Sequence, residues 1–216
     1  MFDLIVQKLH KEGYRFLAIA VVVTFILLLI SKVLGFIGFI ITTWVYYFFR
    51  DPERFPINDE NYLVSPADGV VTQIVETNGP KELNLEGKKY TRVSIFMDAL
   101  CCHVNRIPNT GEITEIFYKP GKYINATLDK ASEENERNYL KLKSSNGDEL
   151  IVVQIAGMIA RRIVCDVKEG DTIKQGDRFG IIRFGSKVDL YFKNYHLLVC
   201  KNQKTVAGET LIAKKV

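Results

Sequence analysis

The chain contains three histidines, and only His103 stands among other groups that could do chemistry. It lies in the segment FMDALCCHVNRIP, residues 96–108, directly after two cysteines. A histidine can act as a general acid or base near neutral pH because its ordinary pKa is about 6.5. A single histidine near a strand end is also compatible with a structural role, and His196 is interpreted in that way.

Two further segments contain candidate groups. The segment VSPADGV, residues 64–70, puts Asp68 in a Pro/Gly turn before a predicted strand, and RFGSKV, residues 183–188, places a Gly185-Ser186 step between two strand-like runs. Turn chemistry alone explains an aspartate next to a glycine, and a Gly-Ser step is typical of a bulge or turn. Taken separately, neither segment specifies an active site.

Short β-branched runs, punctuated by turn residues, surround all three segments. They are predicted as strands at residues 69–75, 90–96, 111–117, 150–155, 162–167, 179–184 and 188–192. Runs of this length and spacing predict a mainly β fold, a hybrid barrel or sandwich-like catalytic domain. Residues 125–140 are richer in charges and helix formers and are predicted as a short helix or a loop over a site.

The N-terminal region is apolar. Residues 16–30 contain one polar residue and residues 33–49 contain two threonines, so each stretch is marginal against the roughly 20 residues that span a bilayer. One topology is a single tilted helix with Lys32 at membrane depth, which costs about 2.5 to 3.5 kcal/mol. The other is a helical hairpin that turns near Ser31, Lys32 and Gly35. The aromatic residues before Arg50 resemble an interfacial belt.

The hairpin is favoured because it places basic residues from both ends of the apolar region on one side of the membrane, the cytoplasmic side. These residues are Lys8, Lys11, Arg15, Arg50 and Arg54. The predicted organisation is a membrane anchor at 1–50, a proline-containing linker at 51–60 and a catalytic β domain at 61–216. The predicted location is the cell membrane, with the catalytic domain on its cytoplasmic side.

Charge and cysteine content exclude several classes. The net charge of +4 arises mainly in residues 1–50, which contain five Lys or Arg and two Asp or Glu; the rest contain 24 and 23. A nearly neutral domain argues against nucleic-acid binding. Four cysteines in 216 residues do not form a disulfide framework, and no spacing predicts a metal site. No nucleotide-binding glycine motif is present.

In their order and spacing, the segments resemble phosphatidylserine decarboxylase of the short, membrane-anchored bacterial type. The resemblance covers nearly the whole chain. It includes SPADG at 65–69, HVNRIP at 103–108, PGKYINATLDKASEENER at 120–137, QIAGMIARRIV at 154–164 and RFGSKVDLYF at 183–192. Each motif is weak alone, but the ordered set is specific.

The resemblance implies that the chain makes its own cofactor. The hydroxyl of Ser186 would attack the carbonyl of Gly185, and elimination and hydrolysis would leave a pyruvoyl group at position 186. The products would be a β subunit of residues 1–185 and an α subunit of residues 186–216, a heterodimer that could assemble further. Glycine leaves the attacked carbonyl unobstructed, and serine supplies both a nucleophile and a leaving oxygen.

The same resemblance assigns roles to the other groups. A base must activate the weak serine hydroxyl, and His103, oriented by Asp68, is the natural candidate. The pyruvoyl carbonyl would then accept the amine of phosphatidylserine and withdraw the electrons released with carbon dioxide. His103 is also the expected acid for reprotonation, and no metal is required.

The chain departs from the pattern at two places. Longer relatives have a second histidine three positions after the first, where this chain has Arg106, so self-cleavage and decarboxylation would share His103. In addition, residues 98–102 read DALCC, where relatives often have a Ser-Pro and an Asp before the histidine.

Substrate binding is assigned to Arg161, Arg162 and Lys122, whose cations could meet the phosphodiester or carboxylate of the lipid. A solvated strand edge is the competing interpretation of these three residues. Two other functions remain as alternatives: a biotinyl or lipoyl-like carrier domain, which would need an exposed lysine at a hairpin tip, and a catalytically dead membrane scaffold. A related serine-headgroup lipid is an alternative substrate.

Overall fold

The computed structural model describes residues 7–123, 134–157, 162–183 and 186–216, and the chain divides into two units, Met1–Glu53 and Arg54–Val216. In its described residues, 7–53, the N-terminal unit contains two helices, α2 (Gly13–Ile30) and α3 (Lys32–Phe48). They are separated at Ser31, whose backbone is extended and whose side chain accepts a hydrogen bond from the N–H of Val33 at 3.3 Å. This serine ends one helix and caps the next.

The two helices pack closely as an antiparallel pair. Thr24 and Thr42 are joined by a hydrogen bond of 2.8 Å between their hydroxyl oxygens. Gly38 permits this approach, because a Cβ there would lie 2.9 Å from Thr24 Oγ1. Among the described residues, α2 is the helix that is long and apolar enough to cross a membrane, whereas α3 has 17 residues.

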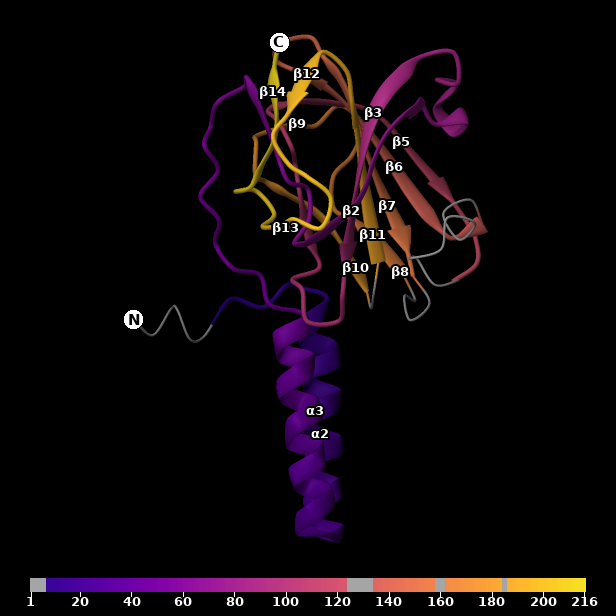
Figure 1. Cartoon of the computed structure of the whole chain (residues 1–216). Helices are drawn as coiled ribbons and strands as arrows, with labels where there is room; N and C mark the ends of the chain where they lie inside the picture. Colours follow the sequence, from indigo (N-terminus) through magenta and orange to yellow (C-terminus); the bar gives the residue numbers. More distant parts are fainter. Residues whose placement is uncertain (1–6, 124–133, 158–161, 184–185) are drawn as a thin grey trace. The chain divides into compact units, whose positions relative to one another are not determined.

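The C-terminal unit is built around an eight-stranded antiparallel sheet (Figure 1). The strand order is β13-β2-β3-β11-β7-β6-β5-β9. The bounds are Lys204–Thr205 (β13), Gly69–Asn78 (β2), Lys89–Met97 (β3), Ser186–Phe192 (β11), Glu149–Ala156 (β7), Arg137–Ser144 (β6), Gly111–Lys119 (β5) and Thr172–Ile173 (β9). The sheet curls into a half-barrel, so the predicted mainly β fold is confirmed.

Two three-stranded sheets complete the described part of the domain. One has the order β4-β10-β8, with bounds Val104–Arg106, Arg178–Arg183 and Arg162–Cys165. The other has the order β1-β14-β12, with bounds Tyr62–Val64, Leu211–Lys215 and Tyr195–Leu197. A short 3-10 helix, η1 (Lys81–Leu83), lies between β2 and β3.

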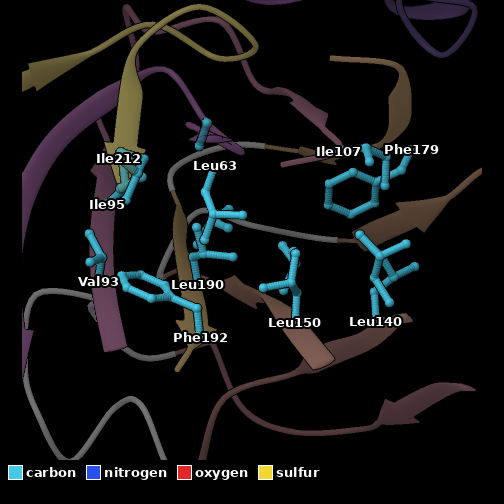
Figure 2. Close-up of a cluster of buried hydrophobic side chains, with 14 of the residues drawn as sticks. Leu63, Val93, Ile95, Ile107, Leu140, Leu150, Phe179, Leu190, Phe192 and Ile212 are labelled. Atoms are coloured by element: carbon cyan, nitrogen blue, oxygen red, sulfur yellow. The ribbon is translucent and has the colours of Figure 1, made fainter. Parts of the chain in front are cut away.

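Side chains alternate between the two faces of the central strands. In β11, Leu190 and Phe192 point into the main core, where they are fully buried among residues of all three sheets (Figure 2). Tyr191 points to the opposite face, into a smaller cluster with Tyr90 and Leu83. Because both faces are covered, every residue of β11 is buried. Ser186 and Asp189 are therefore polar residues in a buried strand.

One local prediction was wrong. Residues 125–140 were expected to form a short helix or a loop, but β6 begins at Arg137. Residues 124–133 lie outside the described part of the chain. The charged residues in this segment suggested a helix, but burial alternates along β6 as in a strand. Asn138, Leu140 and Leu142 face the core, and Lys141 and Lys143 do not. Burial of alternate residues in a sheet outweighs helix propensity here.

Candidate active site

Three candidate segments meet at one end of the central strands. Asp68 immediately precedes β2, Met97 ends β3, and Ser186 begins β11. In the antiparallel ladder Ser186 lies opposite Met97, and Val70 lies opposite Phe96. Segments far apart in the sequence are thereby brought to the same end of the central strands.

The ladder between β4 and β10 brings His103 to this region. His103 precedes β4, and its carbonyl oxygen accepts a hydrogen bond from the N–H of Ile182 at 3.4 Å. Ile182 lies in β10, whose last residue, Arg183, stands three positions before Ser186. The end of β10 therefore ties the histidine segment to the chain just before β11.

Ser186 is fully buried, and its side chain shares the inner face of β11 with Val188. Among the residues that the structure describes, its Oγ makes no hydrogen bond. A buried hydroxyl without a partner is costly in a folded protein and commonly marks a functional position. Gly185, the other half of the predicted cleavage site, lies outside the described residues.

His103 is fully buried, and its Nδ1 lies 3.0 Å from the carbonyl oxygen of Cys101. A carbonyl oxygen can only accept a hydrogen bond, so Nδ1 carries the proton in this contact. In the neutral ring, Nε2 then carries the lone pair. This tautomer is the one that a base acting through Nε2 requires.

The loop before His103 is shaped by Asp98. Its Oδ1 accepts hydrogen bonds from the backbone N–H groups of Leu100 at 2.8 Å and Cys101 at 3.1 Å. Burial tends to raise the pKa of Asp98, but these hydrogen bonds and the charge of His103 outweigh it and lower the pKa. Burial raises the pKa of the Cys101 thiol to about 11. Asp98 is thus a charged carboxylate that interacts electrostatically with His103.

Asp68 is held by other partners. Its Oδ2 accepts a hydrogen bond from Arg54 Nη2 at 2.8 Å, and its Oδ1 accepts one from the N–H of Ala207 at 2.7 Å. Gly69, the next residue, lies so close to β3 that a Cβ would stand 2.2 Å from the carbonyl oxygen of Phe96. Asp68 is therefore fixed just before β2, at the end of the central strands, while the contact to His103 Nδ1 comes from a backbone carbonyl.

Comparison with known proteins decides the family. The family model of phosphatidylserine decarboxylase matches residues 41–213. The chain belongs to the phosphatidylserine decarboxylase family. A phosphatidylserine decarboxylase proenzyme of Pelagibacter ubique is 60% identical over 215 residues, with 100% of both chains covered. Proteins of the same name from Ruegeria pomeroyi (49% identical, 99% of this chain and 98% of the relative) and Rickettsia akari (50%, 95% and 89%) are also similar.

In this phosphatidylserine decarboxylase family member, Arg106 connects three segments. Its Nη1 donates a hydrogen bond to the carbonyl of Gly176 at 2.8 Å, and its backbone N–H donates to the carbonyl of Pro66 at 2.9 Å. The residue is 4% exposed. Arg106 therefore links the SPADG and HVNRIP segments with the segment around Gly176.

The residues predicted to bind the lipid headgroup are exposed where they are described. Lys122 Nζ lies 3.0 Å from Glu134 Oε2, and both side chains are more than half exposed. Arg162 is exposed in β8, opposite Arg183 in β10. Arg161 lies outside the described residues. The substrate-binding role of these three residues stays a prediction.

Sequence reasoning missed a set of buried amides near the candidate site of this decarboxylase. Asn105, Gln154 and Asn138 are at most 2% exposed and are hydrogen-bonded in series. It also missed Arg54 as the partner of Asp68. The available signal was that Asn105 and Gln154 lie within the motifs HVNRIP and QIAGMIARRIV, at positions that face the core.

Proposed function

We propose that the chain is a proenzyme that cleaves itself between Gly185 and Ser186 and, once mature, converts phosphatidylserine to phosphatidylethanolamine. The observation that carries the proposal is Ser186: a fully buried serine, at the first position of a core strand, whose hydroxyl has no hydrogen-bond partner among the described residues. Because the chain belongs to the phosphatidylserine decarboxylase family, we assign this serine the role of the nucleophile.

In the first step, His103 Nε2 accepts the proton of the Ser186 hydroxyl. The oxygen attacks the carbonyl carbon of Gly185, the C–N bond breaks, and the proton passes to the released nitrogen. The product is an ester between residue 185 and the Ser186 side chain. Elimination then breaks the Cβ–Oγ bond, and water hydrolyses the resulting enamine with release of ammonia.

Position 186 fits the group that this sequence of steps would produce. It is small, buried and on the inner face of the sheet, with an oxygen that needs a donor. When formed, a pyruvoyl group at position 186 supplies a carbonyl that accepts the substrate amine and withdraws the electrons released with carbon dioxide. His103, protonated at Nε2, then returns a proton to the reaction site.

The carboxylates of the site have separate roles in the proposal. Asp98 interacts electrostatically with His103 and stabilises its protonated form, since an opposite charge nearby favours the cation. Asp68, paired with Arg54, holds the turn before β2 at the same end of the strands. The carbonyl of Cys101 holds the His103 ring in the productive tautomer.

We also propose that α2 and α3 hold the enzyme in the membrane in which its substrate resides. The length and composition of α2 support this. Phosphatidylserine carries its headgroup at the bilayer surface, so an anchored enzyme would meet it there. The basic residues near both ends of the apolar region favour a cytoplasmic location of the catalytic domain.

The test is carbon dioxide release from phosphatidylserine labelled in the serine carboxylate, using the full-length protein in mixed micelles. We expect labelled carbon dioxide and phosphatidylethanolamine, and we expect prior treatment with phenylhydrazine, which reacts with carbonyl groups, to abolish both. Activity that survives phenylhydrazine would contradict a carbonyl cofactor. A cleaved protein without activity on this lipid would contradict the substrate assignment.

A further inference from the structure

Three buried carboxamides form a hydrogen-bonded chain through the main core. Asn138 Nδ2 donates to Gln154 Oε1 at 2.9 Å, and Gln154 Nε2 donates to Asn105 Oδ1 at 2.9 Å. Asn105 and Gln154 are 0% exposed, and Asn138 is 2% exposed. A carboxamide in an apolar core costs free energy unless its polar atoms are hydrogen-bonded. Each of the three amides is therefore stabilised in the core by its hydrogen bonds to the others.

The series of hydrogen bonds between the three amides fixes the orientation of the Asn105 side chain. Because Asn105 Oδ1 accepts the hydrogen bond from Gln154, Nδ2 of Asn105 must point the opposite way. There it lies 3.7 Å from the sulfur of Met97. A thioether sulfur is a weak acceptor. The three amides thus end in an N–H donor that has a poor partner.

Met97 is also the cross-strand neighbour of Ser186. Residues opposite one another in an antiparallel ladder project from the same face, with Cβ atoms about 4.5 to 5.5 Å apart. Ser186 Oγ is buried and makes no hydrogen bond to the described residues. An amide donor with a weak acceptor and an oxygen without a donor therefore flank the same methionine.

We propose that Asn105 is a catalytic residue that donates a hydrogen bond to Ser186 Oγ during the elimination step of maturation, an inference that rests on the proposed self-cleavage. In this step His103 removes the Cα proton of residue 186, and the electrons of that C–H bond form the Cα–Cβ double bond. The Cβ–Oγ bond breaks, and Oγ leaves with the electron pair as a carboxylate oxygen of residue 185.

The step needs a donor at this atom because negative charge grows on Oγ as it leaves. A preorganised donor in a water-excluded site stabilises such charge without reorganisation. Gln154 and Asn138 hold the amide of Asn105 in place and polarise it, since hydrogen bonds in a chain strengthen one another. Before the reaction, Nδ2 of Asn105 bonds to the sulfur of Met97, a weak acceptor, so its transfer to Oγ costs little.

The experiment follows maturation of the Asn105→Ala variant in the full-length protein by intact mass, with and without hydroxylamine. The ester forms, but its elimination slows about 100-fold, the scale on which loss of one such donor acts. The ester and the original amide have the same mass, so hydroxylamine separates them. It cuts the ester and releases a fragment of residues 186–216 that begins with an unmodified serine.

Three further variants complete the test. Asn105→Asp keeps the side-chain shape and an acceptor for Gln154 but lacks the donor, so it accumulates the same ester and serves if the alanine variant does not fold. Asn109→Ala removes another fully buried asparagine, whose Nδ2 bonds to the carbonyls of Glu60 and Tyr62. Met97→Leu removes the sulfur. These last two variants mature at the wild-type rate without a hydroxylamine-sensitive form.

The outcomes separate the two proposals. Folded Asn105 variants that release a pyruvoyl-blocked fragment at the wild-type rate overturn the role of Asn105. Variants that stay uncut and resist hydroxylamine also overturn it, because the block then precedes the ester. A wild-type chain that is neither cut nor hydroxylamine-sensitive refutes the self-cleavage itself.

Discussion

The Nδ1 atom of His103 lies 3.0 Å from the carbonyl oxygen of Cys101, within a loop that Asp98 closes through two backbone hydrogen bonds. This contact places the proton on Nδ1 and leaves the lone pair on Nε2. In many hydrolases a carboxylate makes the equivalent contact. Here a backbone carbonyl makes it, and Asp98 contributes its charge from the same loop.

The first prediction concerns His103. His103→Ala removes the proposed base, so the chain remains uncut or is cut about 100-fold or more slowly than wild type. The measurement is the fraction of cleaved chain over time on a denaturing gel, with thermal melting to show that the variant is folded. A folded variant that is fully cleaved but inactive would confine His103 to decarboxylation.

The second prediction concerns Ser186. Ser186→Ala leaves one uncut chain without decarboxylase activity, because no oxygen is available to attack the preceding carbonyl. Ser94→Ala is the matched control: Ser94 is also a fully buried serine whose Oγ makes no hydrogen bond to the described residues, but it lies on β3 away from the cleavage site. The control should be cut and active. A cut, active Ser186→Ala protein would end the proposal.

The third prediction concerns the ion pair between Arg54 and Asp68, whose side chains are 14% and 13% exposed. Arg54→Ala leaves a largely buried carboxylate without its cation and should lower the free energy of unfolding by about 2 kcal/mol. Urea denaturation followed by circular dichroism measures this change. Lys122→Ala, which breaks an ion pair with both side chains more than half exposed, should change the stability little. Equal effects of the two substitutions would contradict a structural role for Arg54.

The fourth prediction concerns Glu149 and acid stability. Burial tends to raise the pKa of this carboxyl, but hydrogen bonds from Tyr90, Lys88 and Lys141 outweigh it and lower the pKa from 4.5 to about 2. A lowered pKa in the folded state stabilises the protein above the unfolded value and is lost as the pH falls from about 4.5 toward 2. Unfolding in urea at pH 6, 5, 4 and 3 should show this loss in wild type and less of it in Glu149→Gln. If the free energy of unfolding falls with pH equally in the two proteins, the contacts of Glu149 with Tyr90, Lys88 and Lys141 do not stabilise the fold as stated.

Much of the fold follows from local patterns in the sequence. The β-branched runs that correspond to β2, β3, β5, β7 and β11 have the length and alternation of strands. These two features are enough to predict a mainly β fold. The failure at β6 has a physical cause: its charged residues suit a solvated helix locally, and only the pairing of Arg137 with Ile155 and its neighbours selects the strand. Pairing between distant segments is not encoded in a window of ten residues.

The sequence suggests the reacting groups of the site, which stay a prediction, but not the contacts that support them. Motifs point to Ser186, His103 and Asp68, because those residue types are needed for the chemistry. The supporting contacts come from distant positions: Arg54 lies 14 residues from its partner Asp68, and Gln154 lies 49 residues from its own partner, Asn105. A backbone carbonyl such as that of Cys101 has no sequence signature. Such contacts appear only when the strands are in register.

The central claim is that the chain matures by cleavage at Ser186, and the intact mass of the purified full-length protein tests it most directly. The account predicts two chains, residues 1–185 and 186–216, with the smaller one lacking the amino nitrogen of its first residue because a pyruvoyl group has replaced serine. A single uncut chain with Ser186 unmodified, in a folded preparation, would contradict it.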